Sequence, residues 1–436
     1  MHFQQQGKKN LAKFFDKSVI NKIGKQSGFV LRKARKISAY HFVLGFLLSS
    51  CRKQNSFSSW ALQIGLLSGK CVSKQGLFDR IHSGTVSFAK ELLQAALLKQ
   101  GTKCFTAALF ASFGKVVLQD STTLHLPQVL APIFPGNHSR GEQKAVARIQ
   151  SIIDIKAMKF IDFELGSFTQ NDQSASGRIG AFAKKGDLVI RDLGYFALGT
   201  FEQLIKAGVY FLSRLRYGVS LYDKKGCILS LKDLLKQGKP VDKWVLMGAE
   251  KRVEVRLIML PLPAAQVSEK IRRAKQDRDK RLNHSREYYH WLGYSVYITT
   301  ADHNIWTAKD VAKAYRVRWQ IETIFKSWKT GFHLQELLHE GYGNEHRVKV
   351  SIYLMLLLIC LFMNKIYVHY RYTLQKQNNK KISLLKLTTF TAHHIMEIFL
   401  LPPIRLKELI IRYCCYDCRH DRINMTDLYQ NISLLA

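Results

Sequence analysis

The sequence predicts an α/β protein, in which a mixed sheet with flanking helices is interrupted by a β-rich insertion and lies between helical N-terminal and C-terminal regions. Three observations carry this prediction. Strand-like and helix-like segments alternate in the middle of the chain, short alternating segments interrupt them between about 217 and 294, and apolar residues recur three and four apart near both ends. With 436 residues, the chain has room for two to four domains.

The charge of the chain narrows the class of partner. The sequence has 67 Lys and Arg residues against 32 Asp and Glu residues, which leaves a formal charge of +35. Because 47% of the residues are hydrophobic and 11% are aromatic, this charge lies on folded domains and not on a disordered tail. Such a surplus repels itself unless a polyanion neutralises it, so nucleic acid is the leading partner and an anionic membrane surface the second.

The membrane alternative is the weaker one. The longest apolar run extends from Ile352 to Met363 and is closed by Asn364 and Lys365, whereas a membrane-spanning helix needs roughly 18 to 20 apolar residues. The first residues contain no apolar stretch like that of a signal peptide. We therefore expect a cytosolic protein that contacts no membrane.

Cysteines in the cytosol are expected to be reduced. One cluster of potential zinc ligands is present, and it consists of Cys414, Cys415, Cys418 and His420. No second ligand pair stands at zinc-finger spacing, which favours a reduced, partly buried set over a zinc site.

Residues 1–110 are predicted to form a helical, basic first domain, because apolar residues recur at helical spacing with basic residues between them. Within it, Ser73 is suited to cap a short helix that ends near Ile81. This shape is compatible with a helix-turn-helix that enters a DNA groove. The simpler alternative, a capped helix within a bundle, is favoured by the weakness of the pattern.

Residues 111–216 are predicted to form a mixed sheet. Three adjacent segments rich in Val, Ile and Phe, 115–122, 147–158 and 159–168, indicate an antiparallel meander. A helix near 174–183, a strand at 187–194, a helix at 201–208 and a strand at 209–216 then alternate as in α/β proteins. The alternation of strand and helix resumes in residues 295–340, with a strand at 294–300 and a long helix from about 307 to 330. Residues 341–436 are again predicted to be helical.

The β-rich segment 217–294 contains the densest basic run of the chain. Its cations are Lys270, Arg272, Arg273, Lys275, Arg278, Lys280 and Arg281, and Tyr288, Tyr289 and Trp291 follow. Such runs are often only a solvated helix face, but at this overall charge we favour contact with DNA.

Two aspartates follow buried-looking strands. Asp120 comes after Val116–Leu118 and Asp192 after Leu188–Ile190, so each carboxylate is expected at a strand end, where α/β proteins often place functional groups. Taken singly, each Asp is more often a turn or cap residue.

A third acid, Glu322, lies on a predicted helix among cations. Tyr315, Arg318, Glu322 and Lys329 stand at intervals of three, four and seven, which places them on one stripe together with Lys326. The opposite stripe is apolar, so the helix can bury one side and present an acid on the other. The alternative is an exposed helix whose i,i+4 ion pairs contribute about 0.2 to 0.5 kcal/mol each.

With these residues, the chain resembles the DDE transposases of bacterial insertion sequences, specifically insertion sequence family 4. Tyr315, Arg318, Glu322 and Lys329 match the family's Tyr, Arg, Glu, Lys signature at every position. The segments 119–122 and 192–195 resemble its two aspartate motifs.

The resemblance implies an RNase H-like core that residues 217–294 interrupt. It also implies that Asp120, Asp192 and Glu322 hold two Mg²⁺ ions, with Mn²⁺ as a substitute, because hard cations prefer oxygen ligands. Tyr315, Arg318 and Lys329 are then expected to grip phosphates of the transposon end.

For the remaining regions, the resemblance implies an N-terminal domain that recognises the terminal inverted repeats of double-stranded DNA and a C-terminal region through which two subunits pair. Trp291 is the candidate for holding a flipped base, although a core position is an equal alternative. We therefore predict a transposase that cleaves DNA at the element ends and joins them to target DNA. A nuclease that only hydrolyses and a DNA-binding protein with a disused site are the rivals.

Overall fold

The computed structural model describes residues 15–31, 36–54, 56–101, 108–139, 141–236, 238–277, 285–338 and 343–416. Its N-terminal helices are α2 (Lys17–Gln26), α3 (Ala39–Cys51), α4 (Phe57–Ser68), α5 (Lys74–Phe78) and α6 (Ser83–Leu98). Asp16, Ser38 and Ser73 precede α2, α3 and α5, and their side chains accept hydrogen bonds from first-turn N–H groups. Such caps satisfy donors that have no partner inside the helix, which fixes where each helix begins.

All the named strands belong to one mixed sheet. They are β1 (Val116–His125), β2 (Pro135–Ser139), β3 (Glu142–Asp154), β4 (Lys159–Ser167), β5 (Leu188–Arg191), β6 (Tyr210–Arg214), β7 (Leu221–Tyr222), β8 (Val241–Met247), β9 (Val253–Pro261) and β10 (Tyr294–Thr299). Their order is β2-β3-β1-β5-β6-β10-β9-β8-β7, and β4 pairs with β3. The predicted mixed α/β architecture is confirmed.

The strands β1, β3 and β4 form the predicted antiparallel meander, and β5 and β6 run parallel to β1. Parallel neighbours need a crossover, which here contains the 3₁₀ turn η3 (Ser176–Ala181) before β5 and the helix α7 (Leu198–Lys206) before β6. The helix expected near 174–183 is thus a shorter 3₁₀ turn.

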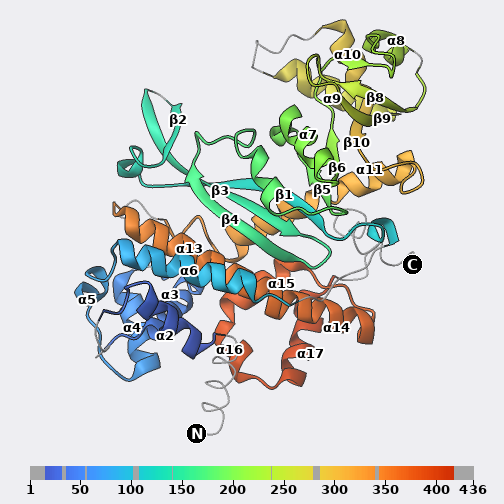
Figure 1. Ribbon diagram of the computed structural model, residues 1–436. Helices are drawn as coiled ribbons and strands as arrows, with labels where there is room; N and C mark the ends of the chain where they lie inside the picture. The colour runs from blue at the N-terminus through green and yellow to red at the C-terminus, as the bar shows by residue number, and fades with distance from the viewer. Residues whose placement is uncertain are drawn as a thin grey trace.

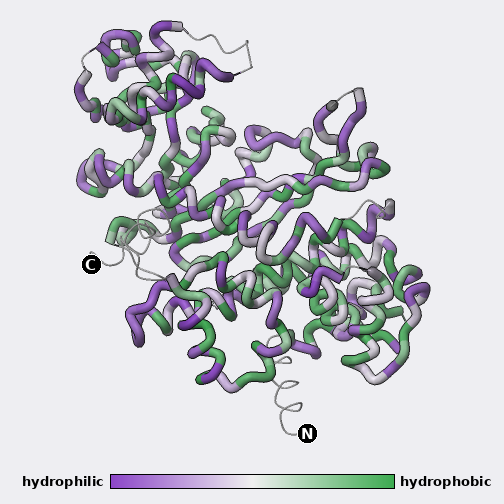
Figure 2. Tube along the Cα trace, turned by 180° about the vertical axis from the view of Figure 1, so that it is seen from behind, coloured by the Kyte–Doolittle hydropathy of each residue, from purple (hydrophilic) through white to green (hydrophobic). Residues whose placement is uncertain are grey.

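Two hydrophobic cores lie on the two faces of the sheet, because successive strand residues point to opposite sides. Leu118 belongs to the core that contains residues of α6, α12 (Trp319–Lys326) and α13 (Glu345–Leu361), whereas Val117 belongs to the core that contains residues of α7. Figure 1 shows the helical layer, with α6 and α13 side by side, beneath the sheet. Figure 2 shows hydrophobic stretches in these layers and many hydrophilic stretches in the lobe that carries β8 and β9.

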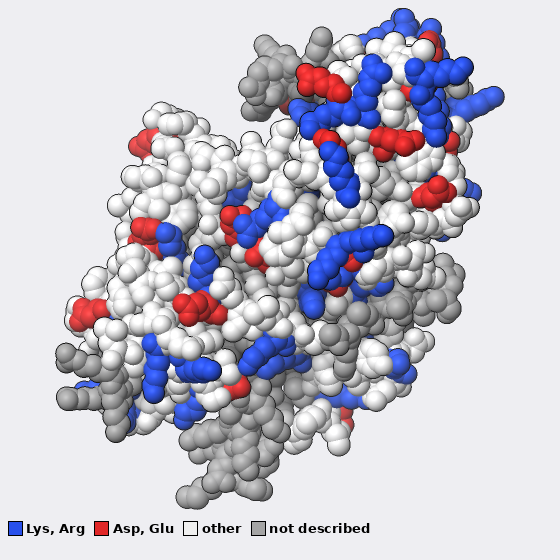
Figure 3. Space-filling view, viewed as in Figure 1, with Lys and Arg blue, Asp and Glu red and all other residues white. Residues whose placement is uncertain are grey.

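The described residues between β6 and β10 form this lobe, which contains β7, β8 and β9 and the helices α8 (Leu231–Lys236), α9 (Ala264–Gln276) and α10 (Arg286–Leu292). Because β9 pairs with both β8 and β10, the lobe extends the main sheet. The helix α9 has no buried residue. Figure 3 shows Lys and Arg side chains gathered over the lobe.

The expected long helix from about 307 to 330 is divided in the structure. It consists of α11 (Ala308–Arg316), α12 and a π-helical turn, η5 (Ser327–Gly331). At the junction, the N–H groups of Val317 and Arg318 donate to carbonyls three residues back, at 3.1 Å each, and not four residues back. This tighter turn separates α11 from α12 and places Arg318 at the junction.

The C-terminal helices are α13, the π-helical turn η6 (Phe362–Tyr367), α14 (Val368–Asn378), α15 (Leu384–His393), α16 (Ile395–Leu400) and α17 (Pro403–Cys414). Within the described ranges, one continuous helical stretch, Glu345–Asn378, is long and apolar enough to cross a membrane. In its most apolar part, 78% is buried inside the protein. A core helix of a soluble protein passes the same test, so this stretch is weak evidence for a membrane.

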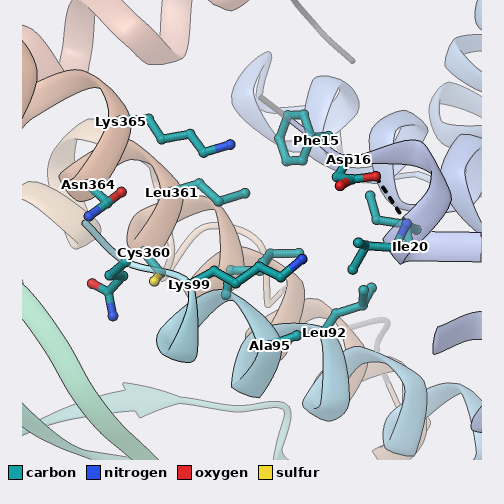
Figure 4. A pocket seen from close by; sticks show the side chains of 14 residues that line it. Phe15, Asp16, Ile20, Leu92, Ala95, Lys99, Cys360, Leu361, Asn364 and Lys365 are labelled. Atoms are coloured by element: carbon teal, nitrogen blue, oxygen red, sulfur yellow. Dashed lines mark hydrogen bonds between the residues drawn. The ribbon is translucent and has the colours of Figure 1, made fainter. Parts of the chain in front are cut away.

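The N-terminal and C-terminal helices pack against each other around a small cavity of about 100 Å³. Its apolar wall includes Ile20 of α2, Leu92 of α6 and Leu361 of α13. Figure 4 shows Lys99 and Lys365 extending across this cavity on the side where Asp16 lies. The N-terminal helices α2 and α6 and the C-terminal helix α13 therefore share one core beneath the sheet.

Candidate active site

Asp120, on β1, and Asp192, the residue after β5, lie at the end of the ladder between these two parallel strands. The ladder between β1 and β5 ends at the pair Gln119 and Arg191, and each Asp is the next residue. Asp192 follows its strand as predicted, whereas β1 continues beyond Asp120 to His125 as a partner of β3. The carboxyl ends of parallel strands are where α/β proteins commonly place functional groups.

Arg318 joins the third acid to these two. Its Nη1 lies 3.7 Å from Asp120 Oδ2, and its Nε lies 3.5 Å from Asp192 Oδ1. Its Nη2 lies 2.8 Å from Glu322 Oε1, one turn along the chain. Only 11% of the Arg318 side chain is exposed. Three carboxylates that are far apart in the sequence therefore share one buried guanidinium.

The electrostatics of this cluster follow from burial and charge. Burial raises the pKa of Asp120 to about 7, which the hydrogen bond from the Ser121 N–H and the charge of Arg318 only partly offset. Burial would lower the pKa of Arg318, but the charge of Asp192 and its other neighbours outweigh burial and raise this pKa. The three acids thus stabilise a cation between them. Without a cation, keeping Asp120 ionised in this buried place costs free energy.

Tyr315 lies beneath the cluster and not on an exposed stripe. It is 2% exposed, and its hydroxyl group donates a long hydrogen bond of 3.5 Å to Asp192 Oδ1. The guanidinium of Arg214 lies over its ring, 5.3 Å from the centroid. Burial raises the pKa of Tyr315, so its hydroxyl group keeps its proton at neutral pH.

The two predicted lysines differ in their surroundings. Lys326 is exposed on α12. Lys329 is partly buried in the π-helical turn η5, and burial lowers its pKa. A π-helical turn changes the angular spacing of the residues in it, so the seven-residue interval from Glu322 to Lys329 does not correspond to one straight helical stripe.

Divalent ions are the cofactor that the sequence implies for the three acids. The chemistry of the three acids fits Mg²⁺, because carboxylate oxygens are the ligands that this ion prefers. The three carboxylates also converge on the positive charge of Arg318. In their present arrangement, no three Asp, Glu, His or Cys side chains of the described residues are close enough to share an ion. An ion held by these acids would compete with Arg318 for their negative charge.

The predicted DNA-binding cations of the lobe that the structure describes lie on α9, which follows β9 in the chain. In the sheet, β6 and β10 separate β9 from β5, the strand that precedes Asp192. On α9, Arg272 and Arg273 both pair with Glu269, at 2.8 and 2.7 Å, and all three side chains are solvent-accessible. Lys275 lies 5.9 Å from the ring of Tyr289. Arg278, like Lys280 and Arg281, lies outside the described residues.

Trp291 lies in the core of the lobe. Trp291 is 9% exposed, and the centroid of its ring lies 5.7 Å from the ring centroid of Tyr217. This arrangement favours the core alternative over a base-holding role.

Of the potential zinc ligands, Cys414 and Cys415 are buried, and Cys418 and His420 lie outside the described residues. Burial raises the pKa of the Cys414 thiol to about 12. This favours a neutral thiol over the thiolate that a metal site needs.

Sequence reasoning missed several polar groups around the acids. Arg214 follows Ser213, the β6 partner of Arg191, and therefore lies level with Asp192 at the edge of the parallel strands. Asp172, in the loop after β4, accepts hydrogen bonds from residues beside Asp120. The signal that could have found Arg214 is its place at the end of an apolar strand, but Asp172 has no such signal.

Comparisons with known proteins bear on this site. A family model described as the transposase DDE domain matches residues 111–363, more than half of the chain, and spans all three acids. The chain belongs to the DDE transposase family.

This transposase is similar along most of its length to transposases of bacterial insertion sequence elements. It is 27% identical to that of IS231D from Bacillus thuringiensis subsp. finitimus, over 88% of this chain and 84% of the relative. It is 26% identical to that of IS231B from Bacillus thuringiensis subsp. berliner, over 89% and 85%. It is 26% identical to that of IS1151 from Clostridium perfringens, over 76% and 74%.

Among solved structures, the transposase matches a cryo-EM structure of the piggyBac transposase synaptic complex with hairpin DNA. The TM-score is 0.46 at 11% identity, over 98% of this chain and 84% of the other. The predicted DDE transposase family is confirmed by the family model, whereas membership of insertion sequence family 4 stays a prediction.

Proposed function

We propose that this protein, which is similar to insertion-sequence transposases, cleaves double-stranded DNA at both ends of its element and joins those ends to target DNA. One observation carries the proposal. In a chain of the DDE family, Asp120, Asp192 and Glu322 converge on one guanidinium beside the carboxyl ends of parallel strands.

In this proposal, residues 111–216 and 295–340 form an RNase H-like core, and residues 217–294 are its insertion. The meander β1-β3-β4 followed by the parallel strands β5 and β6 supports the core. The return of the chain from the lobe into β10, which pairs with β6, supports the insertion.

Asp120, Asp192 and Glu322 would hold the divalent ions at the place between them that the Arg318 guanidinium takes. When bound, two Mg²⁺ ions would activate a water or 3′-hydroxyl group and stabilise the leaving oxygen of an in-line phosphoryl transfer. Arg318, which pairs with Glu322 one turn along the chain, would then bind a phosphate of the DNA, because planar guanidinium groups bind phosphates bidentately.

Tyr315 and Lys329 act beside this centre. The Tyr315 hydroxyl group, 3.5 Å from Asp192 Oδ1, orients that carboxylate and the DNA end next to it. Lys329 supplies a point charge for the phosphates. Lys326, which is exposed on α12, supplies a second positive charge for the phosphates.

DNA outside the active site is held by basic surfaces in this proposal. The face of α9 with Arg272, Arg273 and Lys275 tracks the phosphate backbone, since all three side chains are exposed. Residues 1–110 recognise the terminal inverted repeats, and two subunits pair through residues 341–436. The surplus of charge supports DNA as the partner in the cytosol.

The experiment compares Asp120→Asn, Asp192→Asn and Glu322→Gln with the wild type in cleavage of element-end DNA. Each change removes a ligand charge with almost no change in volume, so cleavage should fall by about a hundredfold or more while DNA binding persists. Asp162→Asn is the matched control, because Asp162 also pairs with an arginine, Arg178 Nε at 2.8 Å, but on β4. Wild-type cleavage by any of the three variants would remove that acid from the proposal.

A further inference from the structure

The residues that flank the two aspartates point to the opposite face of the sheet. Asp120 faces α12 and contacts Arg318 there, whereas Gln119 and Ser121 face the loops that precede η3, where they bond to residues 175 and 172. Arg191 precedes Asp192 in the same way and bonds on the same far face as Gln119. The catalytic face therefore has a polar layer directly behind it.

Arg191 forms one end of this layer. It is 0% exposed, and its Nη2 donates to Gln119 Oε1 at 2.6 Å. Its Nη1 donates to Ser176 Oγ at 2.9 Å, and its Nη2 also donates to the Ser176 carbonyl at 2.6 Å. Within the described residues, no carboxylate pairs with it.

Asp172 forms the other end. Its Oδ1 accepts hydrogen bonds from Ser121 Oγ at 2.7 Å, from Arg148 Nη1 at 2.8 Å and from Gln150 Nε2 at 3.0 Å. The Oε1 of Gln150 accepts in turn from the Tyr195 hydroxyl group at 2.5 Å. Asp172 is therefore tied to the residue after Asp120 and, through Gln150, to the turn that follows Asp192.

A buried charge without an opposite charge is costly, and it persists only where hydrogen bonds hold it in one geometry. The Arg191 bond to Gln119 joins β1 to β5 at the last pair of their ladder, one residue before each Asp. We propose that Arg191 and Asp172 are positioning residues, which set the separation of Asp120 and Asp192 from the far face of the sheet. This inference rests on the proposed role of the two aspartates as ion ligands.

The test measures Mn²⁺ binding to the full chain without DNA, by the electron paramagnetic resonance signal of free Mn²⁺. Arg191→Lys keeps the charge, but a single ammonium group lacks the planar fork that reaches Gln119 and Ser176 together. Its Mn²⁺ affinity should fall about tenfold or more, as is typical when residues behind metal ligands are changed. End cleavage should need correspondingly more Mn²⁺.

Arg256→Lys is the matched control. Arg256 is also 0% exposed, and it bonds to both oxygens of Asp242 at 2.7 Å, but on β9 in the lobe. Its replacement should lower the melting temperature at least as much as Arg191→Lys and leave Mn²⁺ affinity within twofold of wild type. Equal Mn²⁺ affinities in the two variants would overturn the inference, because Arg191 would then serve stability alone.

Ser121→Ala and Asp120→Asn complete the design. Ser121→Ala removes a single hydroxyl group from the Asp172 end, so it tests the layer even if Arg191→Lys does not fold, and it should weaken Mn²⁺ binding in the same direction. If Ser121→Ala and Arg191→Lys bind Mn²⁺ with wild-type affinity while Asp120→Asn binds it more weakly, the positioning role of the polar layer is overturned and the ligand assignment stands. Wild-type affinity in Asp120→Asn overturns the ligand assignment of the proposed function, and the layer with it.

Discussion

The guanidinium of Arg318 lies 2.8 Å from the carboxylate of Glu322, four residues along the chain. An isolated pair at this spacing on an exposed helix contributes only a few tenths of a kcal/mol. Here the same guanidinium is 11% exposed and also lies within 4 Å of Asp120 and Asp192. Arg318 is therefore the shared counter-ion of the three acids, and a metal ion bound by these acids would compete with it.

Arg318→Ala should affect stability and cleavage separately. Without a divalent ion, the variant should lose about 2 kcal/mol of unfolding free energy, because three acids are left without their shared cation. Saturating Mg²⁺ should restore most of this loss, because the ion supplies the missing charge, while end cleavage stays at least about tenfold below wild type. Thermal unfolding with and without Mg²⁺, and a cleavage assay, measure the two effects.

Arg178→Ala is the control for this prediction, since Arg178 pairs with Asp162 and Glu164 on β4. Its loss of stability should not respond to Mg²⁺. If Arg318→Ala instead cleaves normally and loses the same stability at every Mg²⁺ concentration, Arg318 is only a structural partner of the acids.

The basic run on the lobe should appear in the salt dependence of DNA binding. Replacing Arg272, Arg273, Lys275 and Arg278 with Gln should flatten the slope of log affinity against log salt by about three to four units, at about 0.9 per phosphate contact. The loss should be equal for element ends and random DNA, because phosphate contacts carry no sequence information. Binding titrations between low and physiological salt measure this slope.

Glu269→Gln provides the opposite change at the same place. Glu269 pairs with both Arg272 and Arg273, so its neutralisation should strengthen DNA binding and steepen the slope. Unaltered slopes in both variants would show that this run is a solvated helix face.

Lys270, which begins the basic run, should make stability depend on pH. Burial, assisted by the charge of Arg214, lowers the pKa of Lys270 to about 8, and its Nζ donates a long hydrogen bond of 3.4 Å to the Tyr294 carbonyl. Between pH 8 and about 10.5, the unfolded chain binds more protons at this residue than the folded chain, so the unfolding free energy rises with pH.

Lys270→Met should therefore stabilise the protein by about 1 kcal/mol at pH 7, a value reduced for partial exposure. This gain should disappear by about pH 10.5, where the lysine is neutral in both states. Lys275→Met on the exposed side of α9 is the control and should show no such trend in denaturant unfolding at several pH values. A gain that does not change with pH would indicate that only packing has improved.

Much of the fold and the three acids could be predicted because their signals are local. Asp120 and Asp192 follow runs of buried strand residues, and Glu322 lies beside the apolar residues Ile321 and Ile324, which the structure buries. These patterns need no knowledge of distant contacts.

The remaining features depend on distant or subtle interactions. Arg191 and Gln119 are 72 residues apart, and each is an ordinary strand residue in the sequence. The junction at Arg318 contains neither Gly nor Pro, so the division of α11 from α12 and the burial of Tyr315 follow from packing and not from a local breaker. Trp291 likewise follows a charged segment, but the packing of the lobe decides its burial.

The central claim, that the protein both cuts and joins DNA, is tested most directly with purified protein, Mg²⁺ and the DNA that flanks its own reading frame, together with a target plasmid. Sequencing of the products should show cleavage at both element ends and covalent joining of those ends to the target, and Glu322→Gln should yield neither. Products that are only hydrolysed, with no joined ends, would contradict the account and identify a nuclease, and joined products from Glu322→Gln would contradict the assignment of the active site.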